Sequence, residues 1–348
     1  MKRRILITKS LSILALLILF SSWNVNNTYA QSSTITNGLS WLGTQQNADN
    51  SIGNITSTTD ITQTTIAVID TLQALSQTNT TLYSNAVSWL QSQSISTTDY
   101  LSERIFTLLS GGSDEGLLVS YRDPSSGVWG FYAGYGINNL DTALALDALK
   151  SVNYCGQSTI SNAILYLVTN QNTDGGWGFY AGDDSNVYMT ALVLQTFDMF
   201  DSTFNLKNSI SNAAAYLAAH QNSDGGFGSS PSTVYETALS FLALLSSGQG
   251  SALPIQQAIN YITTTQSSDG SWNEDAYSTA LALWALGSYL PNLYIDQSEI
   301  GISYTSVTVG SIISVSAILH NNGGLGAANK YFSCFYRFNS LEKIHMEG

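Results

Sequence analysis

The sequence predicts an all-α fold in which helix pairs close into a ring, and two observations carry this prediction. The first is a motif whose closing aromatics, Trp129, Trp177, Phe227 and Trp272, lie 48, 50 and 45 residues apart. The second is an alternation of two kinds of helix, one with a single apolar stripe and one apolar almost all round. A fixed period of this length is typical of repeat architectures.

The repeated motif joins the two helices of each pair. An aromatic residue is followed five residues later by Gln and three residues further on by Asp. These positions are Gln46, Gln171, Gln221 and Gln266, followed by Asp49, Asp174, Asp224 and Asp269. Gly after Asp can adopt the left-handed conformation that ends a helix. We expect each Gln to bond exposed backbone groups at a neighbouring helix end, and each closing aromatic to pack beneath the turn.

The helices before and after the motif differ in their apolar pattern. Before Gln171, residues Ile160, Ala163, Ile164 and Leu167 form one apolar stripe, which indicates an outer helix. After the motif, segments such as 190–194 are apolar almost all round, which indicates an enclosed inner helix. The second predicted pair lacks the Asp-Gly turn, and the third has a weak outer helix. The six predicted pairs are 34–47 with 60–76, 82–94 with 98–110, 113–122 with 140–151, 157–171 with 187–200, 207–221 with 233–246, and 254–266 with 275–288.

Over about residues 34–290 these motifs resemble the QW-type repeat of squalene-hopene cyclases, oxidosqualene cyclases and protein-prenyltransferase β subunits. The resemblance implies an (α/α)6 toroid with a central cavity at one end. Thioester domains of complement-like proteins and assorted secreted proteins share that toroid. The fold alone therefore does not fix the function.

The residues that do the chemistry in those families are mostly replaced here. Squalene-hopene cyclases carry D-x-D-D-T-A, whereas residues 138–143 read NNLDTA, so that Leu140 holds the proton donor's place and only Asp141 and the following Thr-Ala remain. The prenyltransferase zinc motif D-x-C corresponds to DTA at 141–143 and ETA at 236–238, which lack the thiolate. Cys155 lies in YCGQS rather than the thioester motif CGEQ, so we interpret it as a loop thiol. We expect no metal and no cofactor.

The starts of the inner helices and the preceding turns are expected to meet at one rim of the ring. This rim collects Asp60, Asp141, Asp183, Asp184, Glu236, Glu274 and Asp275, with Tyr132, Tyr135, Tyr180, Tyr188, Tyr235 and Tyr277. Carboxylates favour helix N-termini through the helix dipole, which is one interpretation. The other is a cavity for a ligand with apolar or carbohydrate faces. A glycosidase-like carboxylate pair would be Asp141 and Glu236.

The N-terminal residues 1–30 are typical of a secretory signal peptide. Lys2, Arg3 and Arg4 precede an apolar stretch from 11 to 20, and Thr28 to Ala30 supply small residues at the cleavage positions. An uncleaved membrane anchor is the alternative, although the apolar stretch is shorter than the roughly 20 residues of a spanning helix. Cleavage leaves 7 Lys and Arg against 24 Asp and Glu, a net charge near −17. Such a chain repels nucleic acid.

The C-terminal region, 291–348, changes to period-two alternation, as in Ile313, Val315, Ala317 and Leu319. It resembles the start of a CARDB-type adhesion module, an immunoglobulin-like sandwich. A full sandwich needs roughly 100 residues. We therefore expect a truncated or frame-shifted β-sandwich fragment that is poorly ordered.

The leading functional hypothesis is a secreted or cell-surface recognition module. Its contact site would be the rim, its partner a small ligand, a glycan or a protein, and the adhesion-like tail suggests association with the cell surface. The lost catalytic positions motivate this hypothesis. The alternative is an enzyme on isoprenoid or polysaccharide substrates, of the terpene cyclase or prenyltransferase type, that uses Asp141 or Glu236.

Overall fold

The computed structural model describes residues 33–54, 58–248 and 252–289, together with short strands at 5–6 and between 293 and 346. The chain divides into two units, Ser33–Gly287 and a second unit formed by Met1–Ser32 and Ser288–Gly348. Apart from the strand β1 (Ile5–Leu6), the predicted signal peptide lies outside the described residues. The side chain of Asp60 and those of the second unit also lie outside them.

The first unit consists of six consecutive helix pairs, as the repeat predicts. The weak third outer helix is present as nine residues, Ser113–Tyr121. The pairs are α2 (Ser33–Gly43) with α3 (Thr58–Ala74), α4 (Thr81–Ser92) with α5 (Thr98–Leu108), α6 (Ser113–Tyr121) with α7 (Asn139–Ser151), α8 (Gln157–Thr169) with α9 (Val187–Phe204), α10 (Lys207–Ala219) with α11 (Val234–Ser246), and α12 (Ala252–Thr264) with α13 (Ala276–Tyr289).

The closing aromatics of the motif are buried between the outer and inner helices. Trp129, Trp177, Phe227 and Trp272 are all fully buried. Each indole also satisfies an outer-helix carbonyl: the Nε1 atoms donate to Leu118, Leu167 and Ile262 at 2.8, 2.8 and 2.7 Å. A buried tryptophan contributes a large apolar contact area, and its N–H usually needs a hydrogen-bond acceptor. Here the acceptor is in each case a carbonyl of the preceding outer helix.

The motif glutamines of four pairs connect their pair to the next one, as the sequence predicts. The side-chain amide of Gln221 donates to the carbonyl of Gly225 in its own turn at 2.9 Å and to that of Pro254, at the start of α12, at 2.9 Å. Gln171 makes the equivalent bonds to Gly175 at 2.8 Å and to Ser209 at 2.9 Å. Both amide hydrogens are thereby used, one within the repeat and one across to the following outer helix.

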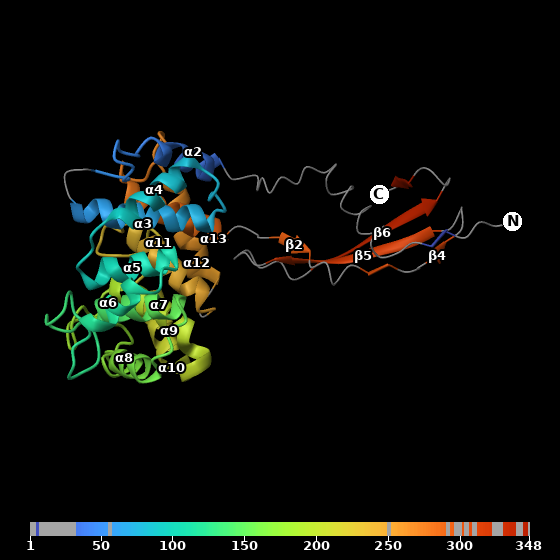
Figure 1. Ribbon diagram of the computed structural model, residues 1–348. Coiled ribbons are helices and arrows are strands. Elements are labelled where there is room, and N and C mark those ends of the chain that lie inside the picture. Colours follow the sequence, from blue (N-terminus) through green and yellow to red (C-terminus); the bar gives the residue numbers. More distant parts are fainter. Residues whose placement is uncertain are drawn as a thin grey trace. The chain divides into compact units, whose positions relative to one another are not determined.

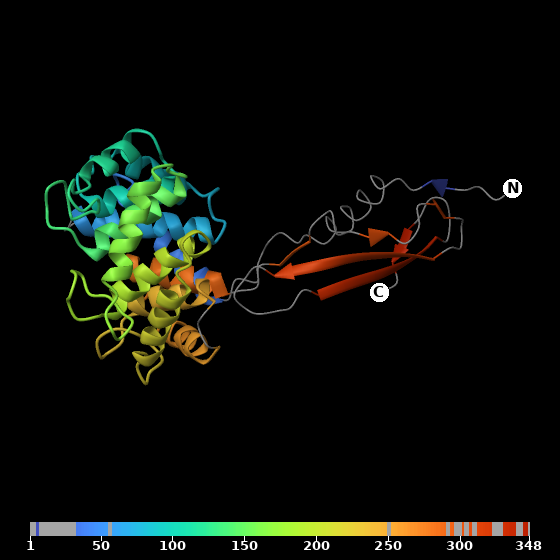
Figure 2. The ribbon, with the colours of Figure 1, turned by 90° about the horizontal axis from the view of Figure 1, so that it is seen from below.

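The same contact closes the ring. Gln266 of the last repeat donates to Gly270 and to Thr34 of α2, both at 2.8 Å. In the inner layer, the Thr71 hydroxyl of α3 donates to the Ala280 carbonyl of α13 at 2.8 Å. In both views the blue helices α2 and α3 lie beside the orange α12 and α13 (Figures 1 and 2). No described helix is long and apolar enough to cross a membrane.

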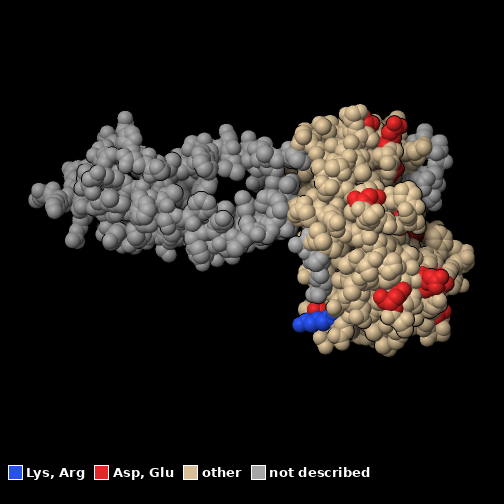
Figure 3. All heavy atoms as spheres, turned by 180° about the vertical axis from the view of Figure 1, so that it is seen from behind, with Lys and Arg blue, Asp and Glu red and all other residues tan. Residues whose placement is uncertain are grey.

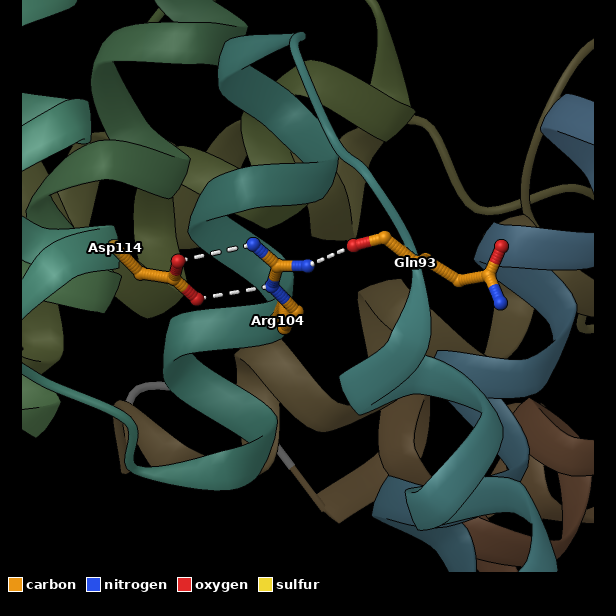
Figure 4. Close-up of polar contacts among 3 residues, drawn as sticks. All are labelled: Gln93, Arg104 and Asp114. Carbon is orange, nitrogen blue, oxygen red and sulfur yellow. Dashed lines mark hydrogen bonds and ion pairs between the residues drawn. The ribbon is translucent and has the colours of Figure 1, made fainter.

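A buried ion pair ties α5 to its neighbours. Arg104, 8% exposed, makes two bonds of 3.0 Å to the Asp114 carboxylate at the start of α6. Its third contact, 2.6 Å to the Gln93 carbonyl, reaches the end of α4 (Figure 4). The ion pair links the second helix pair to the third, and its two-pronged guanidinium contact fixes orientation as well as distance.

The second unit contains an antiparallel sheet of order β2-β5-β6-β7, in which β3 also pairs with β5. β5 pairs with β6 along most of its length, from Ile312 opposite Arg337 to Leu319 opposite Lys330. The bounds are β2 (Leu293–Ile295), β3 (Gly301–Ile302), β4 (Ser306–Val307), which pairs with β1, β5 (Ile312–Asn321), β6 (Lys330–Phe338) and β7 (Ile344–Met346). The predicted poor order concerns segments outside the described residues.

Replacing Gly270 with Ala is expected to destabilise the ring. Gly270 has φ +96°, and a Cβ there would lie 2.5 Å from the Asn37 carbonyl of α2. Gly182 is the matched control, since its φ is +84° but nothing lies within 4 Å. Gly182→Ala should cost about 1 kcal/mol of unfolding free energy, and Gly270→Ala about 1–3 kcal/mol more. Denaturant unfolding followed by helical circular dichroism checks this, and equal losses would contradict it.

Candidate functional site

The N-termini of the inner helices meet at one end of the ring. The Thr98 amide at the start of α5 donates to the Phe131 carbonyl at 2.8 Å, and the Asn139 amide of α7 donates to the Phe179 carbonyl at 2.9 Å. The loops of the third and fourth pairs thus lie over the start of the preceding inner helix. We call this end, formed by the inner-helix starts and the loops before them, the rim.

The predicted carboxylates Asp141 and Glu236 occupy the same capping position on two inner helices. Asn138 accepts from the Asp141 amide at 2.8 Å and returns a bond to its carboxylate at 2.5 Å. Thr233 accepts from the Glu236 amide at 3.3 Å and donates to its carboxylate at 2.7 Å. In both, the N-cap side chain caps the helix and also donates to the carboxylate three residues further on. The helix-terminus interpretation of these acids therefore has a geometric basis.

Asp141 nonetheless differs from an ordinary capping residue. It is 1% exposed, and its Oδ1 atom has no hydrogen-bond partner. Burial raises the pKa of Asp141 to about 6, partly opposed by the Asn138 hydrogen bond and reinforced by the charge of Asp99. A pKa of about 6 suits this rim carboxylate to hold a proton closer to neutral pH than an ordinary Asp does.

A cavity of about 910 Å³ opens at the rim. Tyr188, Tyr235 and Tyr277, the equivalent residues of α9, α11 and α13, lie in its wall with successive ring centroids 6.3 Å apart. We call this space the rim cavity. Its lining comes from α3, α9, α11, α13 and the adjoining loops: Gln45, Gly53, Asn54, Gln63, Thr64, Tyr188, Thr233, Tyr235, Asn273, Glu274, Asp275, Ala276, Tyr277 and Ser278.

The remaining predicted rim residues lie outside the rim cavity's wall. Tyr132 and Tyr180 are on the loops over α5 and α7, 44% and 42% exposed, and Tyr132 packs against Tyr135 at 4.9 Å. Asp183 accepts from the Tyr180 amide at 2.9 Å and shapes its loop, and Asp184 is exposed. The structure therefore brings together Tyr188, Tyr235, Glu274, Asp275 and Tyr277, but not the whole predicted set.

Beneath the rim cavity, a smaller space of about 180 Å³ lies between the inner helices. We call it the central cavity. Three residues, Gln63, Tyr188 and Tyr277, line both spaces, and the Gln63 amide lies 3.4 Å from the Tyr277 hydroxyl. All six inner helices contribute to its lining: Gln63, Ile66, Ala67, Asp70, Ser102, Glu103, Phe106, Thr107, Leu144, Asp147, Tyr188, Leu192, Gln195, Met199, Leu239, Tyr277, Leu281 and Trp284.

The central cavity holds three acids that the sequence analysis missed. Burial raises the pKa of Asp70 to about 7, against a lowering hydrogen bond from Thr107, and that of Asp147 to about 7, against one from Thr196. The pKa of Glu103 lies well above its usual value through burial and the charges of Asp99 and Asp70. Acids inside otherwise apolar inner helices were the available signal, as in Asp70 within IAVIDTL.

Metal ligation finds no support in the described part of the chain. No group of three or more His, Cys, Asp and Glu side chains is placed there to hold one ion. Cys155 is an exposed loop residue, and His220 stacks on Tyr216 at 3.9 Å. Acidic side chains are scattered over the surface shown in Figure 3, and basic ones are scarce on it.

Stability is expected to fall as pH rises through neutrality. Asp70 and Asp147 have folded-state pKa values of about 7, above the unfolded value. Their contribution to the free energy of unfolding is fully present below pH ~4, where both states hold the proton, and is lost as pH rises through the folded-state pKa of about 7. Asp147→Asn should therefore raise the melting temperature at pH 8 and leave it nearly unchanged at pH 4. Thermal unfolding across that range tests this.

Asp123→Asn is the control for that titration. Hydrogen bonds from Ser125 and Ser126 lower the pKa of Asp123 to about 2. Its contribution is therefore constant from pH 5 to 8, and the variant should keep the wild-type slope of melting temperature against pH. A wild-type slope in Asp147→Asn as well would contradict the assignment.

Comparison with known proteins places the helical unit among α/α toroids. Residues 142–282 match the squalene-hopene cyclase C-terminal domain, and no curated protein sequence matches the chain. The ent-copalyl diphosphate synthase from Streptomyces platensis is 19% identical to this chain, with a TM-score of 0.52. The match covers 66% of this chain and 50% of that enzyme, so this chain spans about half the length of the synthase. The type II terpene cyclase MstE from Scytonema is 14% identical with a TM-score of 0.58, over 74% and 97%.

A carbohydrate-active enzyme shares the same architecture. An inactive variant of an α-1,6-mannanase from a Salegentibacter species, in complex with α-1,6-mannotriose, is 8% identical with a TM-score of 0.56, over 73% of this chain and 97% of that one. At such identities the likeness concerns the fold. The chain therefore has a helical unit of the terpene-cyclase-like α/α toroid fold, with a squalene-hopene cyclase-like segment at 142–282.

Proposed function

We propose that the protein is a secreted or cell-surface recognition module that binds a glycan in the rim cavity. The observation that carries the proposal is the row of Tyr188, Tyr235 and Tyr277 in the wall of that cavity. Tyrosine rings offer apolar faces for sugar rings to stack on, and their hydroxyls and the nearby amides and carboxylates offer hydrogen bonds. At about 910 Å³ the cavity has room for two or three sugar units.

The protonation state of the tyrosines supports this role. Burial raises the pKa of Tyr188, of Tyr235 and of Tyr277, with smaller contributions from neighbouring acids. The phenols therefore stay neutral at physiological pH and both donate and accept hydrogen bonds. Sugar hydroxyls have the same double capacity, so a row of neutral phenols complements them.

The surroundings of the cavity fit recognition of a large ligand. Phe131, Tyr132 and Tyr135 form an aromatic cluster on the rim, with exposed fractions of 39, 44 and 49%. Exposed aromatics that gather in one place mark interaction sites more often than single ones do. The CARDB-like character of residues 291–348 and the signal peptide are part of the proposal, since both accord with action outside the cell.

The second candidate is an enzyme of the terpene cyclase type. The match of residues 142–282 and the buried acid Asp141, whose pKa is about 6, favour it. The size of the central cavity opposes it. A cavity of roughly 150 Å³ accommodates benzene, and this one measures about 180 Å³. A substrate of twenty or more carbon atoms would need several times that space.

Tyr235→Ala should weaken glycan binding by roughly ten-fold, about 1.4 kcal/mol. The variant removes the middle ring of the row. Mannose and glucose oligosaccharides, proline-rich peptides and farnesol are titrated against the full chain by isothermal calorimetry. Only the oligosaccharides are expected to bind.

The matched control is Tyr83→Ala on the outer helix α4. Tyr83 is half-buried like Tyr235, but its hydroxyl pairs with Gln73 and it lies outside the rim cavity's wall. It should bind oligosaccharides like wild type. Equal weakening by the two variants, or binding of farnesol alone, would refute the proposal, and the latter would favour the second candidate.

A further inference from the structure

The wall of the central cavity contains three acidic side chains and no basic one. Asp70, Glu103 and Asp147 enter it from the consecutive inner helices α3, α5 and α7. Of the basic residues of the helical unit, none lines the cavity. Arg104, next to Glu103 in sequence, is directed to Asp114 and to the Gln93 carbonyl instead (Figure 4). No side chain in the wall of the central cavity therefore supplies a positive charge to these acids.

Unpaired polar atoms in the same wall point independently to a ligand. Ser102 is fully buried, lines the cavity, and its Oγ atom has no hydrogen-bond partner. Glu103 Oε2 and Asp147 Oδ1 also have none. A buried polar atom without a partner costs free energy, so native proteins rarely retain several in one place. A group that brings several N–H donors would satisfy all three.

The rest of the lining suits an organic cation rather than a metal ion. Phe106, Tyr188, Tyr277 and Trp284 line the space, and aromatic faces attract ammonium groups. A metal ion needs ligands gathered around one point, and no three acids in the described residues are so placed. An ammonium tolerates a wider spread, because its three donors reach in different directions and its remaining contacts are electrostatic.

We propose that the central cavity binds the primary ammonium group of an organic ligand, with Glu103, Asp147 and Ser102 as its hydrogen-bond acceptors. The volume of about 180 Å³ admits an ammonium on a short carbon chain or a single ring. Gln63, Tyr188 and Tyr277 line both cavities, so the group enters from the rim. It arrives either on a free amine or on a ligand seated in the rim cavity, such as an amino sugar.

Calorimetric titration of the full chain with n-butylamine and with glucosamine tests the site. Butanol and glucose are the neutral counterparts of matching size. The amines are expected to bind at least ten-fold more tightly than their counterparts. Binding of glucosamine without butylamine supports entry on a rim ligand, and binding of both supports entry as a free amine. Amines that bind no better than their neutral counterparts would overturn the proposal.

Glu103→Gln identifies the site. The substitution keeps the shape and removes the carboxyl group that can give its proton up to an amine and pair with the resulting ammonium, so it should weaken amine binding at least ten-fold. It is expected to fold, because burial, which raises the pKa of Glu103 well above its usual value, does not penalise a neutral amide in the same way. Glu115→Gln on the outer helix α6, away from the cavity wall, should bind amines like wild type. Wild-type affinity in Glu103→Gln would overturn the proposal.

The outcome is independent of glycan recognition. Tyr235 lines the rim cavity and is absent from the wall of the central cavity. Tyr235→Ala should therefore leave the affinity for butylamine unchanged while it weakens oligosaccharide binding. Loss of butylamine binding in Tyr235→Ala would show that the amine sits at the rim, and would also overturn the proposal.

Discussion

The architecture depends on one side-chain amide that is used twice in four of the six repeats. A Gln amide has two hydrogens, and the motif assigns one to its own turn and the other to the start of the next outer helix. The bond of Gln266 to Thr34 is the same contact between the last repeat and the first. Ring closure therefore requires no special device. Because the contact lies at the turns, it also fixes the direction in which every inner helix begins.

Closure has a consequence for the axis of the ring. Six inner helices that face a common centre cannot all bury their inward surfaces against one another, and the structure leaves two spaces there that share three wall residues. The upper one is lined by the helix starts, where unpaired backbone amides attract polar side chains. The lower one is lined by mid-helix residues, where any acid is removed from bulk water. The same fold thus produces a polar, open cavity above a small one with raised carboxyl pKa values.

The sequence predicts the helix pairs because the outer helices carry a clear 3.6-residue stripe and the turns carry their own chemistry. Gln171, Asp174 and Trp177 can be assigned to roles from local rules alone. The acids of the central cavity could not be assigned, since a helix that is apolar all round has no periodicity to show which side faces the axis. Asp70 and Asp147 acquire their meaning only when the ring closes. Asp141 was found through a family signature, yet its capping bonds to Asn138 became visible only in the structure.

The acids of this toroid lie in two settings that differ in the partners of their carboxylate oxygens. At the rim, Asp141 and Glu236 each spend one carboxylate oxygen on a helix cap, so that protein packing already fixes their position. On the axis, Glu103 and Asp147 each keep an oxygen free of partners in a space too small for a long hydrocarbon. Asp141 combines the two properties, since its carboxylate is fixed by Asn138 and its Oδ1 atom also has no partner. It lines neither the rim cavity nor the central cavity, so the structure places this acid outside the walls of both spaces.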